Sequence, residues 1–173
     1  MQVQLPGSHF DHMLRQTRQH HIHLSSMADS KANMLLTMSS IVVTLAMPFL
    51  LKEELHLVAL VLIPFSVLAI LLAAYTTFPR LHHVPEEERS FSSKGFNPLF
   101  FGHFTTLPYE EYEHLMEELL NDPSKTYEVQ VREIYSLGIF LKNRKYRYLR
   151  YAYFSFLSGI VLSSIIFVIT FTI

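Results

Sequence analysis

The chain contains no cysteine among its 173 residues. This absence excludes a disulfide framework, a zinc site built on thiolates and a cysteine nucleophile. The sequence also lacks a Gly-rich phosphate loop, a nucleophile elbow and an HExxH zinc motif. The net charge is −1, so no overall positive field attracts nucleic acid. We therefore predict that the protein is not an enzyme and that it binds no metal, no cofactor and no polynucleotide.

Charge is missing from three long stretches, and these stretches organise the chain. Residues 32–51 hold no charged side chain, and residues 151–173 hold none either. Residues 55–78 carry only His56 as an ionisable group. Because a helix that crosses a bilayer needs about 20 apolar residues, each stretch is long enough to be a span. We predict an all-α integral membrane protein with three transmembrane helices.

The three spans divide the chain into four segments. Residues 1–31 form an N-terminal arm or helix, and residues 32–78 form a transmembrane hairpin because Lys52–Glu54 leaves room only for a tight turn. A cytoplasmic helical segment follows over residues 79–150, and its stretch Leu81–Pro108 is expected to be irregular for much of its length. The third transmembrane helix occupies residues 151–173 and is expected to continue from that segment, because no helix breaker follows Pro123.

The distribution of basic residues predicts the orientation. The segment 79–150 holds ten of the fourteen lysines and arginines, whereas the turn between the first two spans holds one. Basic residues beside a span favour the cytoplasmic side. The N-terminus and residues 79–150 are therefore expected in the cytoplasm and the C-terminus outside.

Two polar stretches stand where apolar runs meet water. Asp29, Lys31 and Asn33 precede the first run, either as charges that fix where the span begins or as a polar site between helices. Lys142–Arg150 interleaves basic residues with tyrosines just before the third run. This pattern is typical of a membrane anchor, which we favour over polynucleotide binding. Binding of a small anionic ligand stays open for this stretch.

Two further groups of residues receive simpler interpretations. Five histidines precede the first run: His9, His12, His20, His21 and His23. No carboxylate or cysteine completes a ligand set with them, so a solvated polar face is favoured over a metal site. In the last run, small residues recur at every fourth position: Ser155, Gly159 and Ser163. Such a seam lets helices pack closely, within one chain or between chains.

Several short motifs also occur in a characteristic order. The chain reads IHLSSMADSKANMLL at 22–36, NPLFFGHF at 97–104, TLPYEEY at 106–112, REIYSLG at 132–138 and KNRKYRYLRYAY at 142–153. Together with the hairpin of spans and the final span, this order resembles the Pycsar effector transmembrane family over nearly the whole chain. The resemblance implies a bacterial anti-phage role that ends in abortive infection. In such systems a cyclase makes cyclic CMP or cyclic UMP on infection, and the membrane effector responds by impairing the inner membrane.

The resemblance also frames the candidate ligand site. The candidate contacts for the anion of a cyclic pyrimidine mononucleotide are Lys31, Arg144, Lys145 and Arg147, beside Asp29 at the membrane entry. Asn33 and Asn97 are candidate partners of the base or ribose. As a hypothesis, the ligand shifts the helices toward a homo-oligomeric, leaky arrangement. The chain has no room for a nucleotide-binding β-barrel, so the alternative is an anchor or scaffold that docks a partner and senses no ligand itself.

Overall fold

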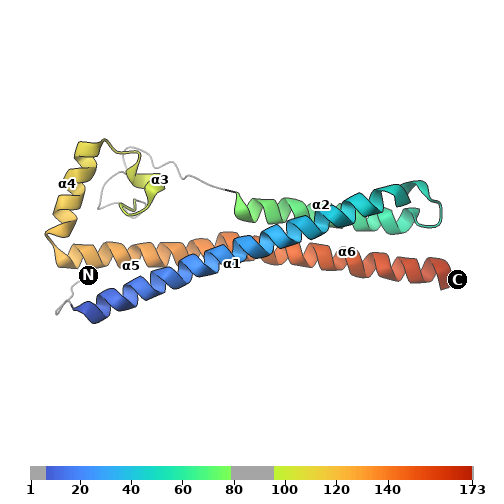
Figure 1. The fold of residues 1–173 in the computed structure, drawn as a ribbon, viewed down its shortest axis with the longest axis horizontal. Coiled ribbons are helices and arrows are strands. Elements are labelled where there is room, and N and C mark those ends of the chain that lie inside the picture. The colour runs from blue at the N-terminus through green and yellow to red at the C-terminus, as the bar shows by residue number, and fades with distance from the viewer. Residues whose placement is uncertain (1–6, 79–95, 173) are drawn as a thin grey trace. The chain divides into compact units, whose positions relative to one another are not determined.

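The computed structural model describes residues 7–78 and 96–172, and every secondary-structure element in these two ranges is helical (Figure 1). No strand occurs in the part of the chain so described. The elements follow in the order α1 (Ser8–Ala46), η1 (Met47–Leu51), α2 (His56–Thr77), α3 (Phe101–Phe104), α4 (Tyr109–Leu120), α5 (Pro123–Phe140), η3 (Leu141–Tyr146) and α6 (Arg147–Thr172). The predicted all-α class is confirmed. Most of the stretch Leu81–Pro108, expected to be irregular, falls outside the described residues.

Within residues 7–78 and 96–172, three helices are long and apolar enough to cross a membrane, as predicted. The first is Ser8–Leu51, in which helix α1 passes into the 3-10 helix η1 at Met47. Pro48 explains this change, because proline cannot donate the backbone hydrogen bond that an α-helix requires. The second is His56–Thr77, and the third is the 50-residue run Pro123–Thr172. The long continuous helix expected after Pro123 is therefore present.

The start of α5 is capped by Asp122. Asp122 Oδ1 accepts hydrogen bonds from the backbone N–H groups of Ser124, at 2.9 Å, and Lys125, at 3.3 Å. Pro123 occupies the first helical position, where a missing N–H costs nothing. The start of α4 has no side-chain cap. Pro108 takes the N-cap position, and the Thr106 hydroxyl donates to the His103 carbonyl at 2.7 Å.

The chain forms two compact units. The described residues of unit 1 are 7–23 and 96–139, and those of unit 2 are 24–78 and 140–172. Helix α1 and the run from α5 to α6 each contribute residues to both units. The segment boundaries expected after residues 31, 78 and 150 remain a prediction.

Unit 1 is held by polar contacts between the start of α1 and helix α5. The Tyr127 hydroxyl donates to Asp11 Oδ1 at 2.7 Å, and this bond to a carboxylate raises the pKa of Tyr127. Arg18 Nη2 lies 3.1 Å from Glu133 Oε1. Burial raises the pKa of Glu133, whose side chain is 13% exposed, and the charge of Arg18 opposes that shift.

Unit 1 also contains the folded turn around the NPLFFGHF motif. The Asn97 side-chain oxygen accepts from the Leu99 N–H at 3.0 Å, and the Asn97 N–H donates to His103 Nδ1 at 2.9 Å. Phe96 is fully buried and its ring stacks on His103. A Cβ at Gly102 would lie 2.6 Å from the Phe100 ring, so only glycine fits without a shift. This part of the motif therefore builds a compact turn.

Unit 2 is a bundle of the later part of α1, helix α2 and helix α6, packed mainly through small residues. Its buried cluster comprises Ala28, Ala32, Leu35, Ala69, Ala73, Leu149, Ala152 and Phe156. These positions recur three or four residues apart in each helix, which places them on one face. Small side chains let helix backbones approach closely, and this is the usual source of helix association in lipid.

Candidate functional site

The candidate site lies at one end of unit 2, where Asp29 of α1 meets Lys145 of η3. Lys145 Nζ donates to both carboxylate oxygens of Asp29, at 2.7 and 2.6 Å. The Lys145 side chain is only 11% exposed, whereas that of Asp29 is 38% exposed. A lysine held so far from water needs a partner, and the carboxylate supplies it. These two residues are 116 positions apart in the sequence, and the structure brings them together.

The local backbone at Lys145 is unusual. Residues Leu141–Tyr146 form a π-helix within an otherwise α-helical run. π-helical turns are rare and occur often at functional sites. Because each turn of a π-helix holds an additional residue, the side chains in and after it point in directions that an α-helix would not give them. Arg144 and Lys145 both belong to this segment.

Three tyrosines complete this end of the bundle. Arg144 Nη1 donates to the Tyr75 hydroxyl at 3.2 Å, and the Tyr146 hydroxyl donates to the Leu24 carbonyl at 3.1 Å. The rings of Tyr75 and Tyr148 lie 4.4 Å apart. We call Asp29, Tyr75, Arg144, Lys145, Tyr146 and Tyr148 the charged end of unit 2. Sequence reasoning assigned no role in the site to the tyrosines, although their position beside apolar runs marks them as interfacial.

The other predicted ligand contacts of unit 2 do not join the ion pair. Lys31 and Asn33 are exposed on α1, and the Asn33 backbone carbonyl accepts from Thr37 at 3.0 Å. Asn33 follows Asp29 by one helical turn and so shares its side of the helix, whereas Lys31 does not. Arg147 is exposed, with its guanidinium carbon 5.8 Å from the centre of the Tyr151 ring.

Asn97 belongs to unit 1, where its side-chain oxygen is engaged in the turn with Leu99. Its contribution to a ligand site therefore stays a prediction. Among the described residues, no group of three or more His, Asp or Glu side chains is placed to hold a metal ion.

Two of the three small residues of the last span, Ser155 and Gly159, contact helix α2. Ser155 Oγ donates to the Phe65 carbonyl at 2.8 Å. A Cβ at Gly159 would lie 2.6 Å from Phe65 Cβ, so the two helices touch there. Ser163 is also buried, at 5% exposure. These contacts are within one chain.

The side chains of the charged end offer little for bond-making chemistry. The lysine is a positive group whose only described partner is a carboxylate, and an anion of similar charge can compete for it. Two arginines near it, Arg144 and Arg147, are exposed and can reach a soluble anion. The arrangement is suited to binding an anion and to exchanging one contact between helices for a contact with a ligand.

Fold and site together define a multi-pass α-helical membrane protein in which an ion pair between two helices lies at one end of the unit 2 bundle. The chain matches the family model described as the Pycsar effector protein domain, PycTM, over residues 12–172, and it therefore belongs to that family. Membership makes it an effector of anti-phage cyclic-nucleotide signalling, as its motifs predict. Searches of curated proteins and of solved structures found no match.

Proposed function

We propose that this chain senses a cyclic pyrimidine mononucleotide directly at the charged end of unit 2. Binding drives the chain into a homo-oligomer that impairs the bacterial inner membrane, without chemical conversion of the ligand. The charged end, the N-terminus and residues 79–150 face the cytoplasm, and the C-terminus lies outside. The single observation that supports this proposal most strongly is the ion pair between Asp29 and Lys145 on a π-helical turn.

The ion pair supplies a contact that an anionic ligand can replace. The phosphate of a cyclic mononucleotide is an acceptor for charged hydrogen bonds, as the Asp29 carboxylate is. Arg144 and Arg147 are exposed and make the first contacts from solution, and Lys145 then exchanges Asp29 for the phosphate. Asp29 is the more exposed partner, so it can be solvated once it is released.

The exchange affects the whole bundle because the two partners belong to different helices. Asp29 lies in α1, one residue after Ala28 of the buried cluster, and Lys145 lies four residues before Leu149 of the same cluster. A ligand shifts an equilibrium only by the difference between its affinities for the two states. Loss of the ion pair favours the arrangement in which α1 and α6 are less tightly joined, and that arrangement associates with further copies.

Dye release from liposomes tests this proposal. The purified protein is inserted into dye-filled liposomes, and cyclic CMP, cyclic UMP, cyclic AMP or buffer is added separately. We expect release with a pyrimidine cyclic nucleotide and none with buffer. If no nucleotide causes release from liposomes that contain folded, inserted protein, direct sensing is wrong and the chain is better explained as an anchor for a sensing partner.

Variants assign the response to residues. The double substitution Arg144→Ala/Lys145→Ala is expected to abolish nucleotide-dependent release while insertion is unchanged. Lys142→Ala is the matched control, because Lys142 is an exposed lysine of the same π-helical segment. We expect it to respond like the wild type. A wild-type response from the double variant would remove Arg144 and Lys145 from the site.

A further inference from the structure

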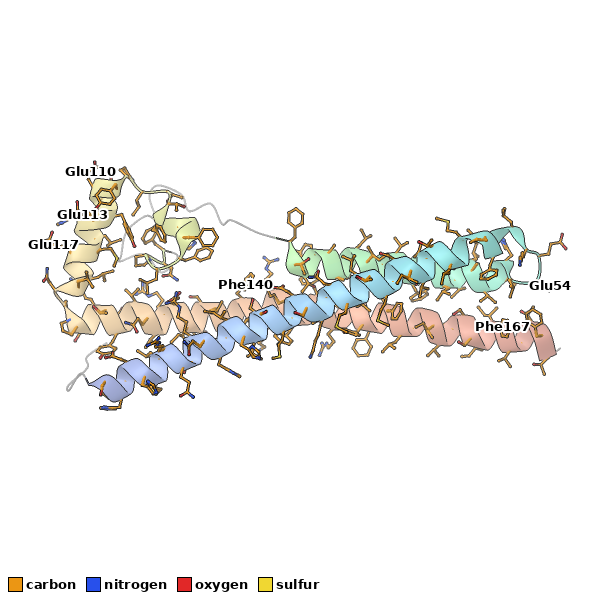
Figure 2. The ribbon with its side chains drawn as sticks, viewed as in Figure 1. Glu54, Glu110, Glu113, Glu117, Phe140 and Phe167 are labelled. Carbon is orange, nitrogen blue, oxygen red and sulfur yellow. The ribbon has the colours of Figure 1, made fainter. Side chains whose placement is uncertain are left out.

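A cavity of about 360 Å³ lies in unit 2, at the end of the bundle opposite the charged end. The end of α1, η1, the first half of α2 and Phe167 of α6 line it, and Figure 2 labels Phe167 and Glu54 in this region. Its lining is entirely apolar and comprises Val42, Leu45, Ala46, Phe49, Leu55, Val58, Ala59, Leu62 and Phe167. We call this region the hairpin end of unit 2.

The cavity is partly open at the surface of the bundle, and its volume falls within the range of small-molecule sites. Small-molecule sites usually measure about 300–1,000 Å³. A water molecule is not stabilised in this space, because a buried water needs at least two hydrogen-bond partners and the lining offers none. An unfilled space costs its lining the dispersion contacts of a packed interior. Within a bilayer, the apolar group at hand to fill it is the acyl chain of a lipid.

Charged groups stand at the rim of the cavity. Lys52 Nζ lies 5.4 Å from the centre of the Phe49 ring, and Phe49 itself lines the cavity. Glu53 and Glu54 follow Lys52 directly in the turn, and all three side chains are exposed. His56 is already engaged, because its Nδ1 lies 2.7 Å from the Leu50 carbonyl. The turn between the lining residues Phe49 and Leu55 therefore carries one cation and two carboxylates next to an apolar space.

We propose that the hairpin end binds one phospholipid whose headgroup carries both a phosphate and a primary ammonium. An acyl chain fills the cavity, Lys52 binds the phosphate, and Glu53 or Glu54 accepts from the ammonium. A primary ammonium has three donors, whereas a trimethylated ammonium has none, so the carboxylates favour the former. A headgroup with phosphate alone would leave both carboxylates facing a negative charge.

The occupant joins two parts of the bundle. Eight of the nine lining residues come from the hairpin, and Phe167 comes from α6. A bound chain therefore contacts both and stabilises the assembled bundle by mass action. This inference does not depend on nucleotide binding, because the charged end and the hairpin end share no residue.

Photo-crosslinking of lipids tests the proposal on the full chain. The protein is reconstituted in separate liposomes that contain a trace of phospholipid with a photoreactive group in its acyl chain and with an ethanolamine, choline or glycerol headgroup. We expect crosslinks concentrated in residues 42–62 and at Phe167, strongest for the ethanolamine lipid. An even distribution over lipid-facing residues, such as Leu68, or equal labelling by the three lipids would overturn it.

Variants separate the acyl site from the headgroup site. Ala59→Phe fills the cavity and is expected to abolish crosslinking there, while Leu60→Phe adds an aromatic ring at the neighbouring exposed position and is the matched control. Lys52→Gln leaves the cavity intact and is expected to lower labelling by the ethanolamine lipid by up to about fivefold, the effect of one exposed charge pair. Labelling of Lys52→Gln that equals the wild type with every headgroup would contradict the headgroup assignment even if Ala59→Phe failed to fold.

Discussion

Unit 1 and unit 2 are each stabilised by a different kind of internal contact. In unit 1, Tyr127 bonds to Asp11 and Arg18 pairs with Glu133, so polar groups join α1 to α5. In unit 2, small side chains such as Ala28, Ala32 and Gly159 bring helices close, and ionic contacts occur at the charged end. Unit 1 should therefore respond to pH and salt, whereas unit 2 should respond to changes in side-chain volume.

The largest contrast is expected from the same substitution made once in each unit. Gly159→Ala places a Cβ at 2.6 Å from Phe65 Cβ, close to the backbone of α2, and should cost about 1–3 kcal/mol of stability. Gly138→Ala meets only His21, at 3.5 Å, and should stabilise its helix by about 0.5–1 kcal/mol. Thermal melting followed by circular dichroism measures both. Equal effects of the two substitutions would refute the contrast between the units.

The next effect concerns the ion pair of unit 2, whose partners are unequally exposed. Asp29→Ala leaves a lysine that is 11% exposed without its carboxylate and should cost about 1–3 kcal/mol. Lys145→Met keeps the length of the side chain and leaves Asp29 partly in water, so it should cost less than about 1 kcal/mol. The measurement is again the melting temperature of the purified protein. A larger loss of stability in Lys145→Met than in Asp29→Ala would show that the unequal burial of the two side chains does not decide the cost of breaking this ion pair.

A smaller effect is expected from serines inside unit 2. Ser155→Ala removes a hydroxyl that donates to the Phe65 carbonyl and should cost about 0.5–1.5 kcal/mol. Ser39 and Ser66 are fully buried, and their hydroxyls have no hydrogen-bond partner among the described residues. Replacing either by alanine should be neutral or slightly stabilising, because an unpaired hydroxyl gains nothing in an apolar interior. A clear loss of stability in Ser39→Ala or Ser66→Ala would contradict this prediction.

The smallest effect is a pH dependence in unit 1. Burial raises the pKa of Glu133 above its ordinary value of 4.5. The Glu133 carboxyl therefore binds its proton more tightly in the folded state than in the unfolded state. The stability of the fold falls as the pH rises from the pKa of Glu133 in the unfolded state through its pKa in the folded state. Glu133→Gln cannot ionise, so it does not lose this stability. The melting temperature of the variant minus that of the wild type should therefore be larger at pH 7 than at pH 4. An equal difference in melting temperature at both pH values would contradict the assignment of this pH dependence to Glu133.

The sequence predicts the helices well because their causes are local. Asp122 and Pro123 mark the start of α5, and the absence of charge marks each span. The sequence also singles out Asp29 and Lys145, yet it does not predict that they pair. The π-helical turn at Leu141–Tyr146 changes the direction of the side chains, and a regular helical period does not reveal it.

Two other features depend on tertiary packing and were not predictable. The cavity at the hairpin end is lined by residues of different helices, among them Ala46, Ala59 and Phe167, and the spacing within one helix does not show how they meet. The NPLFFGHF turn does not bury all of its apolar residues. Gly102 is buried there, but Phe101 is 57% exposed, because the short helix α3 turns it outward.

Equilibrium binding of the cyclic pyrimidine nucleotide to the protein in lipid nanodiscs tests the central claim most directly, since the Asp29 carboxylate is proposed to compete with the ligand for Lys145. Compared with the wild type, Asp29→Asn should bind the nucleotide more tightly, because it removes the competing charge, and Lys145→Met should bind it more weakly. Lys142→Ala should leave the affinity unchanged. Weaker binding by Asp29→Asn, or no binding by the wild type, would contradict the claim that the ligand acts by taking Lys145 from Asp29.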